Sequence, residues 1–263
     1  MQIDTSSYYP KSHLDEDCGE ESREGTHSLF PDRNTDSNEP PTPTVKPSGE
    51  TKPERPDMWT VLLDGIATAL SWIFVPLMAP VYGIMLIFGL SVLSLAPFTS
   101  RLVFTLEIAA YNLVLPALLI LLLKRLHVVD DIGLNGRKER TIPYIITILC
   151  MAGSGVFMLV KGAPMWVAMF FMGGALAGLI NLVVNFRWKI SAHAAAVAGL
   201  PAILVRVMHV DVCQPETLTW LMITILVAGL LGSARIWLGR HTLMQVMAGY
   251  AVGFFCVFFL TML

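Results

Sequence analysis

The chain lacks several features that would assign it to common protein classes. It has no paired cysteine spacing of the kind found in zinc sites, thiol redox motifs or disulfide frameworks, since its four cysteines are scattered (Cys18, Cys150, Cys213 and Cys256). It has no His-x-x-x-His or His-x-x-His-His spacing, which argues against a histidine-rich metal enzyme of the membrane. No basic segment followed by an apolar core stands at its start, so we expect no cleavable signal peptide.

Charge is also scarce. Charged residues make up 14% of the 263 residues and apolar residues 54%, which excludes an ordinary soluble protein. Residues 1–58 differ from the rest: they carry 13 acids and 6 bases, have almost no apolar periodicity, and are expected to form a disordered acidic tail. Residues 59–263 carry 12 bases and 7 acids among apolar runs long enough to cross a bilayer of about 30 Å. We therefore predict an all-α, polytopic transmembrane helix bundle with about six to seven spans.

The order of the apolar runs predicts one interface helix followed by seven spans. Residues 59–71, with Asp64 as their only charge, are expected to lie in the membrane interface or to extend the first span. Pro76 and Pro80 are expected to kink that first span. The seven spans are expected to cover residues 73–95, 102–123, 143–160, 165–185, 190 to about 208, 217–234 and 242–263.

Small residues predict where the spans pack closely. The fourth span contains Gly173, Gly174, Ala177 and Gly178, and the fifth contains the small-residue run 194–199. Small side chains allow the backbones of neighbouring membrane helices to approach one another. The fifth span is therefore expected to contact other helices along its length.

Three basic segments fall on one side of the membrane when crossings are counted: the loop 124–142, the turn 186–189 and the turn 235–241. Nine bases lie on this side and three near the other. The positive-inside rule places the basic side in the cytoplasm. Bases that bind phosphate would weaken this rule, so the side on which the site lies stays open.

The stretch 233–249 contains the most informative spacing. Gly239 is expected to break the helix, so that Arg235 closes one span and His241 opens the next. Gln245 follows His241 by four residues and shares its helix face. A histidine held by a side-chain oxygen beside an arginine fits a phosphate site. The alternative is a short cytoplasmic turn whose arginines obey the positive-inside rule.

The start of the fifth span offers a second set of phosphate-binding groups. Ser191, the amide of Ala192 and His193 stand at a helix N-terminus, where free amides and the helix dipole favour an anion. Fixed cations nearby would stabilise the charge of a transferring phosphoryl group. Such a site binds phosphate without a metal.

These motifs together resemble the type 2 phosphatidic acid phosphatase superfamily. The resemblance rests on Arg235-x5-His241-x3-Gln245, on Ser191-x-His193 and on a basic loop upstream, and it extends over about residues 70–263. It implies an integral lipid phosphatase of the bacterial cytoplasmic (inner) membrane that uses no metal and no other cofactor.

The resemblance also implies a role for each motif residue. His241 is expected to attack phosphorus and form a phosphohistidine, while His193 protonates the leaving alkoxide and later activates water. Arg235, Ser191 and the Ala192 amide are expected to bind the phosphate. His127 and His209 match no motif and are expected to be interface histidines.

The sequence departs from the family pattern in three places. Gln245 stands where the family usually has aspartate; its carbonyl can still accept a bond from His241 Nδ1, but it brings no charge. Ile190-Ser-Ala-His193 replaces Pro-Ser-Gly-His. In the basic loop Arg140 best matches the family's arginine, and either Lys138 or Lys189 is expected to supply the missing lysine charge.

The function expected is hydrolysis of a lipid phosphate or diphosphate, with the bilayer and the lipid as the partners and no nucleic acid. Phosphatidate, phosphatidylglycerophosphate, a polyprenyl diphosphate and a phosphorylated lipid A all fit the sequence, and the oligomeric state is open. A non-catalytic relative that binds or moves anionic lipids is the main alternative. An unrelated transporter or channel, with a basic face that reflects topology alone, is the third.

Overall fold

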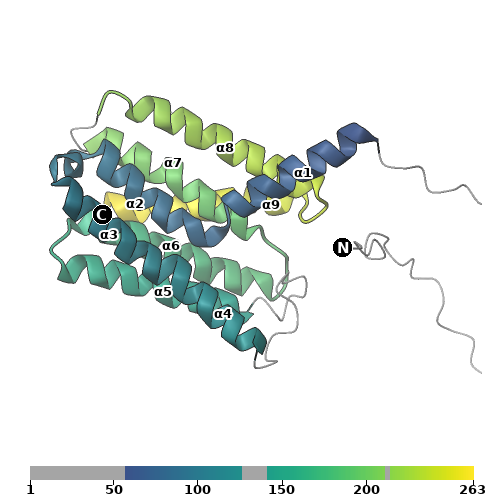
Figure 1. The fold of residues 1–263 in the computed structure, drawn as a ribbon, viewed down its shortest axis with the longest axis horizontal. Helices are drawn as coiled ribbons and strands as arrows, with labels where there is room; N and C mark the ends of the chain where they lie inside the picture. The colour runs from purple at the N-terminus through teal and green to yellow at the C-terminus, as the bar shows by residue number, and fades with distance from the viewer. Residues whose placement is uncertain (1–56, 126–140, 211–213) are drawn as a thin grey trace, which may run out of the picture. The chain divides into compact units, whose positions relative to one another are not determined.

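The computed structural model describes residues 57–125, 141–210 and 214–263, and within these ranges the chain is helical and contains no strand (Figure 1). The predicted all-α fold class is confirmed. The expected acidic tail at residues 1–58 lies almost wholly outside the described residues, and so does most of the basic loop before the third span.

Six helical segments within the described residues are long and apolar enough to cross a membrane. They are α3 to α4 (Phe98–Ala109 and Leu115–Arg125, joined by a π-helical turn), α5 (Thr141–Val160), α6 (Met165–Asn185), α7 (Ala192–Val210), α8 (Thr217–Trp237) and α9 (Leu243–Met262). These bounds lie within a few residues of the predicted second to seventh spans. The chain is a polytopic membrane protein.

The predicted interface helix (59–71) and the predicted first span (73–95) meet at a break in the helix, so together they form one bent pair. α1 (Met58–Ile73) and α2 (Ala79–Leu90) are bent by 41° at a 3₁₀ turn that begins at Pro76. As a pair they make a possible seventh crossing by length and composition. Pro80, predicted to be a second kink, lies in the first turn of α2, where a proline removes no helical hydrogen bond, so that part of the prediction is wrong.

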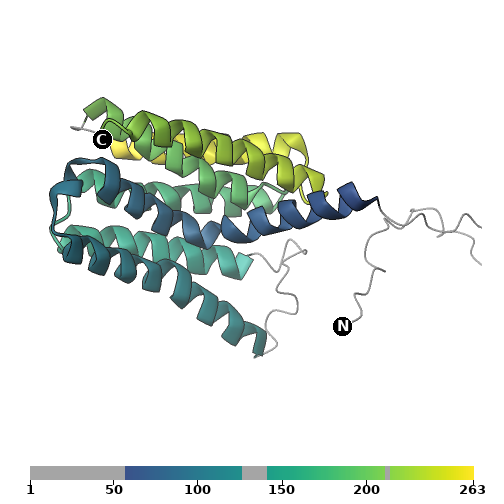
Figure 2. The ribbon, with the colours of Figure 1, turned by 45° about the horizontal axis from the view of Figure 1, so that its top comes forward.

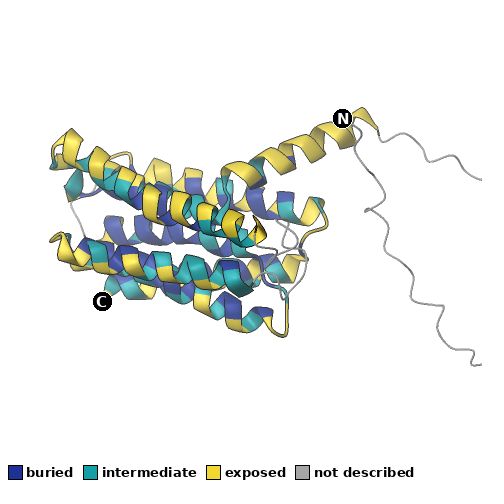
Figure 3. Ribbon diagram, turned by 60° about the horizontal axis from the view of Figure 1, so that its bottom comes forward, coloured by how far each residue is buried: buried dark blue, intermediate teal, exposed yellow. Residues whose placement is uncertain are grey.

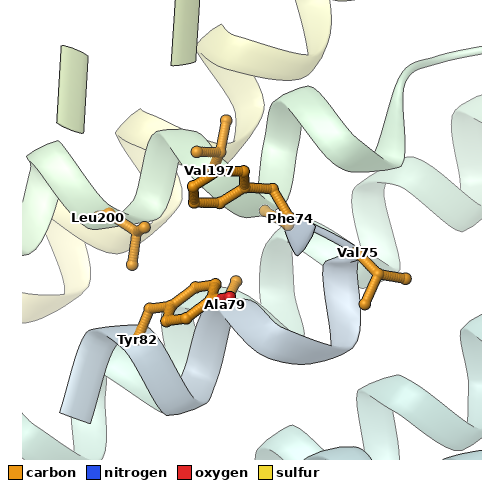
Figure 4. A pocket seen from close by; sticks show the side chains of 7 residues that line it. Phe74, Val75, Ala79, Tyr82, Val197 and Leu200 are labelled. Atoms are coloured by element: carbon orange, nitrogen blue, oxygen red, sulfur yellow. The ribbon is translucent and has the colours of Figure 1, made fainter. Parts of the chain in front are cut away.

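Side chains of α2 and α7 fill the bend between α1 and α2. The hydroxyl of Tyr82 donates to the carbonyl of Ile73 at 3.0 Å, which gives a partner to a group that the broken helix frees. The rings of Phe74 and Tyr82 lie 5.6 Å apart and pack on Val197 and Leu200 of α7 around a void of about 10 Å³ (Figure 4). The bend is thus a packed feature of the fold.

α7 is the central helix of the bundle. It contacts α2, α6, α8 and α9, and 67% of its membrane-spanning window is buried, against 50% or less for the other five spans. Figure 3 shows the contrast, because exposed residues gather on the outward faces of the bundle and cover most of α1. The prediction that the small residues of this span pack on neighbours along its length is confirmed.

Glycines set the closest approaches between helices. A Cβ atom at Gly253 would overlap the carbonyl oxygen of Ala195, and one at Gly249 would lie 2.6 Å from the carbonyl oxygen of Ser191. α9 therefore lies directly on the backbone of α7. The predicted close contacts of α6 are also confirmed, since Gly173 faces α9 while Gly174 and Gly178 face α5.

These contacts bring several helix ends to one end of the bundle. Gly178 of α6 faces Ile148 of α5 and Gly174 faces Met151, so α5 runs antiparallel to α6. Gly249 of α9 meets Ser191 and Gly253 meets Ala195, so α9 runs parallel to α7. The start of α5, the end of α6, the starts of α7 and α9 and the end of α8 consequently lie together. We call this the histidine end, because His193 and His241 are both found there.

Candidate functional site

The turn between α8 and α9 has a defined geometry that begins the site. Gly239 adopts a left-handed conformation (φ 62°), its amide donates to Ile236 at 2.9 Å, and the amide of Arg240 donates to Arg235 at 3.1 Å. This pair of bonds is a Schellman motif, in which glycine is favoured at the left-handed position. The amide of His241 also donates to the carbonyl of Arg235, at 3.3 Å. The predicted break at Gly239 is confirmed.

One oxygen of Gln245 fixes the state of the His241 ring. The backbone N–H of Thr242 donates to Oε1 of Gln245 at 3.2 Å, so the atom that it meets must be the amide oxygen. The same oxygen lies 3.1 Å from Nδ1 of His241. Because an amide oxygen can only accept, Nδ1 carries the proton in this bond, and the neutral ring has its lone pair on Nε2.

Ser191 is the N-cap of α7. Its Oγ accepts from the amide of Ala194 at 3.3 Å and its carbonyl accepts from Ala195 at 3.1 Å, while its own side chain is fully buried. Ala192 and His193 are the first two residues of the helix, where intrahelical partners for the amides are missing. His193 is half-buried. The Oγ of Ser191 therefore caps the start of α7 as an acceptor, and its O–H can still donate a hydrogen bond.

A main-chain bond joins the two motifs. The amide of Ser191 donates to the carbonyl of Gln245 at 3.2 Å, and Gly249, one turn further along α9, contacts the same serine. Two helix N-termini thereby lie side by side, with His193 in one and His241 just before the other. The positive ends of both helix dipoles favour an anion between them.

The structure brings together most of the predicted site residues it describes. Arg235 lies in the last turn of α8 and is half-buried, His241 is 7% exposed, and Lys189 is half-buried in the segment that leads into α7. Lys138 and Arg140, predicted from the basic loop, lie outside the described residues, as does His127. His209 lies at the opposite end of α7 and is exposed.

Two buried asparagines of α6 were not among the site residues predicted from the sequence. Asn185 is 1% exposed and Asn181 3% exposed, and both lie in the last turns of α6 at the histidine end. Their i, i+4 spacing puts them on one helix face, and polar residues inside a membrane span are often functional. The i, i+4 spacing of two asparagines in an apolar run was the sequence pattern that could have identified them.

The polar contact between α1 and α8 was also missed. Nε1 of Trp237 donates to Oδ1 of Asp64 at 2.8 Å, which ties the helix before the first bend to the end of α8. Trp237 follows Arg235 by two residues. The exposed α1 is therefore anchored beside the turn that carries His241.

The arrangement places two histidine rings, an arginine and two helix N-termini at one end of the bundle. Across residues 57–125, 141–210 and 214–263, no three histidine, cysteine, aspartate or glutamate side chains gather closely enough to hold a metal ion. Phosphate is the anion that this set of donors and cations suits best.

No protein-family model, curated protein or solved structure matches the chain.

Proposed function

We propose that the protein is a membrane phosphatase that hydrolyses a lipid phosphate or diphosphate through a phosphohistidine on His241. One observation carries the proposal: Oε1 of Gln245 accepts from both Thr242 N and His241 Nδ1. That bond orients the ring and leaves the lone pair on Nε2, which is the requirement for a histidine nucleophile. The resemblance to type 2 phosphatidic acid phosphatases leads to the same assignment.

In the first step Nε2 of His241 attacks phosphorus. The N–P bond forms as the P–O bond to the lipid breaks, and protonated His193 gives its proton to the leaving oxygen. Arg235 and the amides at the start of α7 stabilise the charge on the phosphoryl oxygens. The diacylglycerol, lipid alcohol or lipid monophosphate then leaves into the bilayer.

In the second step water attacks the phosphohistidine. His193, now neutral, removes a proton from the water as the O–P bond forms and the P–N bond breaks. Inorganic phosphate is released, His241 recovers its lone pair, and His193 is again protonated. No outside reductant, oxidant or nucleotide is needed for this cycle.

The substrate is expected to be a lipid because the site lies at the end of membrane-spanning helices. A phosphate head at the histidine end leaves its hydrocarbon tail among the spans, where the bilayer accommodates it. We propose in addition that the protein resides in a bacterial cytoplasmic membrane.

The test is phosphate release by the purified, detergent-solubilised protein. Phosphatidate, phosphatidylglycerophosphate, a polyprenyl diphosphate and a phosphorylated lipid A should be offered separately, each with EDTA. We expect release from at least one of them, with a rate that EDTA does not change. No release from any of the four, or release that requires an added divalent cation, would overturn the proposal.

Two substitutions at Gln245 test the observation that carries the proposal. Gln245→Leu removes the oxygen that fixes the His241 tautomer, and we expect kcat to fall by about 10² to 10⁴-fold with little change in KM. Gln245→Glu keeps an acceptor oxygen and adds a charge that stabilises the imidazolium, so its kcat should equal or exceed that of the wild type. Steady-state kinetics on the best lipid of the panel measures both, and a leucine variant as active as the wild type would contradict the role of this bond.

The same residue favours a second candidate function. Gln245 has no negative charge to stabilise a phosphorylated, positively charged ring, and a protein of this architecture that binds anionic lipids without turnover would not need one. That alternative predicts lipid phosphate binding that Arg235→Gln weakens, with no phosphate release.

A further inference from the structure

A groove lies on the membrane-facing side of the bundle, between α4 and α5. Its volume is about 420 Å³, within the range of about 300 to 1,000 Å³ that small-molecule sites occupy. It is lined by one face of each helix: Tyr111, Leu115 and Leu119 on one side, and Ile146, Leu149, Cys150, Gly153 and Phe157 on the other. The lining is almost entirely apolar.

The π-helical turn at Ala110–Val114 closes one end of this groove. Asn112, in the middle of that turn, is buried, and its Nδ2 donates to Oγ of Ser154 on α5 at 2.7 Å. The rings of Tyr111 and Phe157 lie 5.4 Å apart at the same level. From this π-helical turn to the C-terminal end of α4, the ribbons of α4 and α5 move apart (Figure 2). The groove is therefore shut deep in the membrane and opens toward the histidine end.

The groove has the length and depth of a lipid chain. Its lining covers 11 steps along α5, from Ile146 to Phe157, or about 17 Å at 1.5 Å per residue. Half of a bilayer's hydrocarbon core is about 15 Å. Leu149 is 66% exposed and Leu115 40% exposed, so the groove faces the surrounding lipid, where hydrocarbon is the solvent that can enter it.

Two cations stand beyond the open end. Lys124 and Arg125 form the last turn of α4, and both are exposed. Lys124 follows Leu119 by five residues, which is about 8 Å along the helix. A positively charged helix end at the membrane surface attracts the phosphate of an anionic lipid.

We propose that the groove between α4 and α5 binds one acyl chain of an anionic phospholipid whose phosphate lies against Lys124 and Arg125. The hydrogen bond between Asn112 and Ser154 closes the groove and so limits how deep the acyl chain extends. The absence of a side chain at Gly153 leaves the groove wide enough for the chain. This site is separate from the histidine motifs and does not rest on the proposed phosphatase activity.

Gly153 allows the groove to be filled without disturbing the core. A Cβ atom there would meet nothing within 4 Å, and the same holds for Gly229 on the exposed face of α8. Gly153→Trp should occupy the groove, whereas Gly229→Trp adds the same side chain to a membrane-facing helix elsewhere. The two variants are thus a matched pair. Lys124→Gln with Arg125→Gln removes the cations at exposed positions and leaves the packing intact.

The experiment is photocrosslinking in phosphatidylcholine vesicles that contain the full chain and a trace of phosphatidylglycerol with a diazirine in one acyl chain. Phosphatidylglycerol has no phosphomonoester, so hydrolysis plays no part. We expect crosslinks to concentrate on residues 111–119 and 146–157, to fall about tenfold there in Gly153→Trp, and to persist in Gly229→Trp and His241→Ala. The double charge variant should reduce them to the level given by a diazirine phosphatidylcholine probe.

Each opposite result overturns the proposal. Crosslinks spread evenly over α5 and α8, or unchanged in Gly153→Trp, would mean that the groove holds no bound chain. Equal labelling by the phosphatidylglycerol and phosphatidylcholine probes in the wild type would refute the anionic head group. A failure of the phosphatase proposal would be seen separately, as a wild-type protein that is labelled normally in this experiment but releases no phosphate from the four lipids of the activity test.

Discussion

Replacement of His241 with alanine is expected to abolish phosphate release from every lipid that the wild-type protein hydrolyses. The ring supplies the only attacking atom in the proposed first step, so its loss should cost about 10⁴ to 10⁶-fold in kcat, as removal of a catalytic nucleophile does elsewhere. His241 lies just before the first turn of α9, and its Nδ1 bonds to Oε1 of Gln245 in that turn, so the bundle should still fold. Phosphate release at saturating lipid measures the effect.

Two further histidine variants make this result specific. His209→Ala removes an exposed ring 16 residues along α7 from His193, about 24 Å away, and should leave the rate unchanged. His193→Ala should slow the second step, so that phosphate from a lipid with an activated leaving group stays bound to His241 in acid-labile form. Residual turnover above a hundredth of the wild-type rate in His241→Ala would refute the nucleophile assignment.

Gly253→Ala is expected to destabilise the protein although alanine is the better helix former. The added methyl group would overlap the carbonyl oxygen of Ala195, and a backbone atom cannot move aside as a side chain can. α9 and α7 must separate, at a cost of about 1 to 3 kcal/mol or more. Because α9 and α7 also carry the two histidine motifs, activity should fall together with stability.

Gly229→Ala is the matched control for this prediction. Gly229 is exposed in the middle of α8, and a Cβ atom there meets nothing within 4 Å. Alanine should stabilise α8 by up to about 1 kcal/mol through its helix propensity. Thermal unfolding of the solubilised protein, followed by circular dichroism, should therefore give Tm shifts of opposite sign. A Gly253→Ala variant as stable as the wild type would mean that α7 and α9 do not pack as described.

The helices and their ends could be predicted because their causes are local. A membrane span needs a long apolar run, and each run after residue 98 gave one helix within a few residues of its predicted bounds. Gly239 ended α8 because a left-handed residue suits glycine. Pro143 lies in the first turn of α5, where a proline removes no helical hydrogen bond.

The features that the sequence did not predict depend on contacts between distant residues. The bend at Pro76 was expected, but the contacts that hold it, from Tyr82 and from residues of α7 more than a hundred positions away, were not. The π-helical turn around Asn112 is accompanied by a bond to Ser154, 42 residues along the chain. Periodicity within one helix carries no information about either partner.

The candidate site was predictable in part for the same reason. Spacing alone put Gln245 on the face of His241, and the bond between them is present. The sequence could not say which atom of the amide faces the ring, because the N–H of Thr242 decides it. Nor could it reveal that the carbonyl of Gln245 binds Ser191, since that depends on how α7 lies against α9.

Gln245 serves the molecule through two chemically separate parts. Its carbonyl belongs to the backbone and holds the start of α7 whatever side chain the residue carries, while its side-chain oxygen bonds to Thr242 N and His241 Nδ1 at the start of α9. An exchange between amide and acid at this position can therefore alter the reactivity of the histidine without loosening the junction of the two helices. Among related proteins, substitutions at residue 245 could therefore change the catalytic rate while the contact between α7 and α9 stays the same.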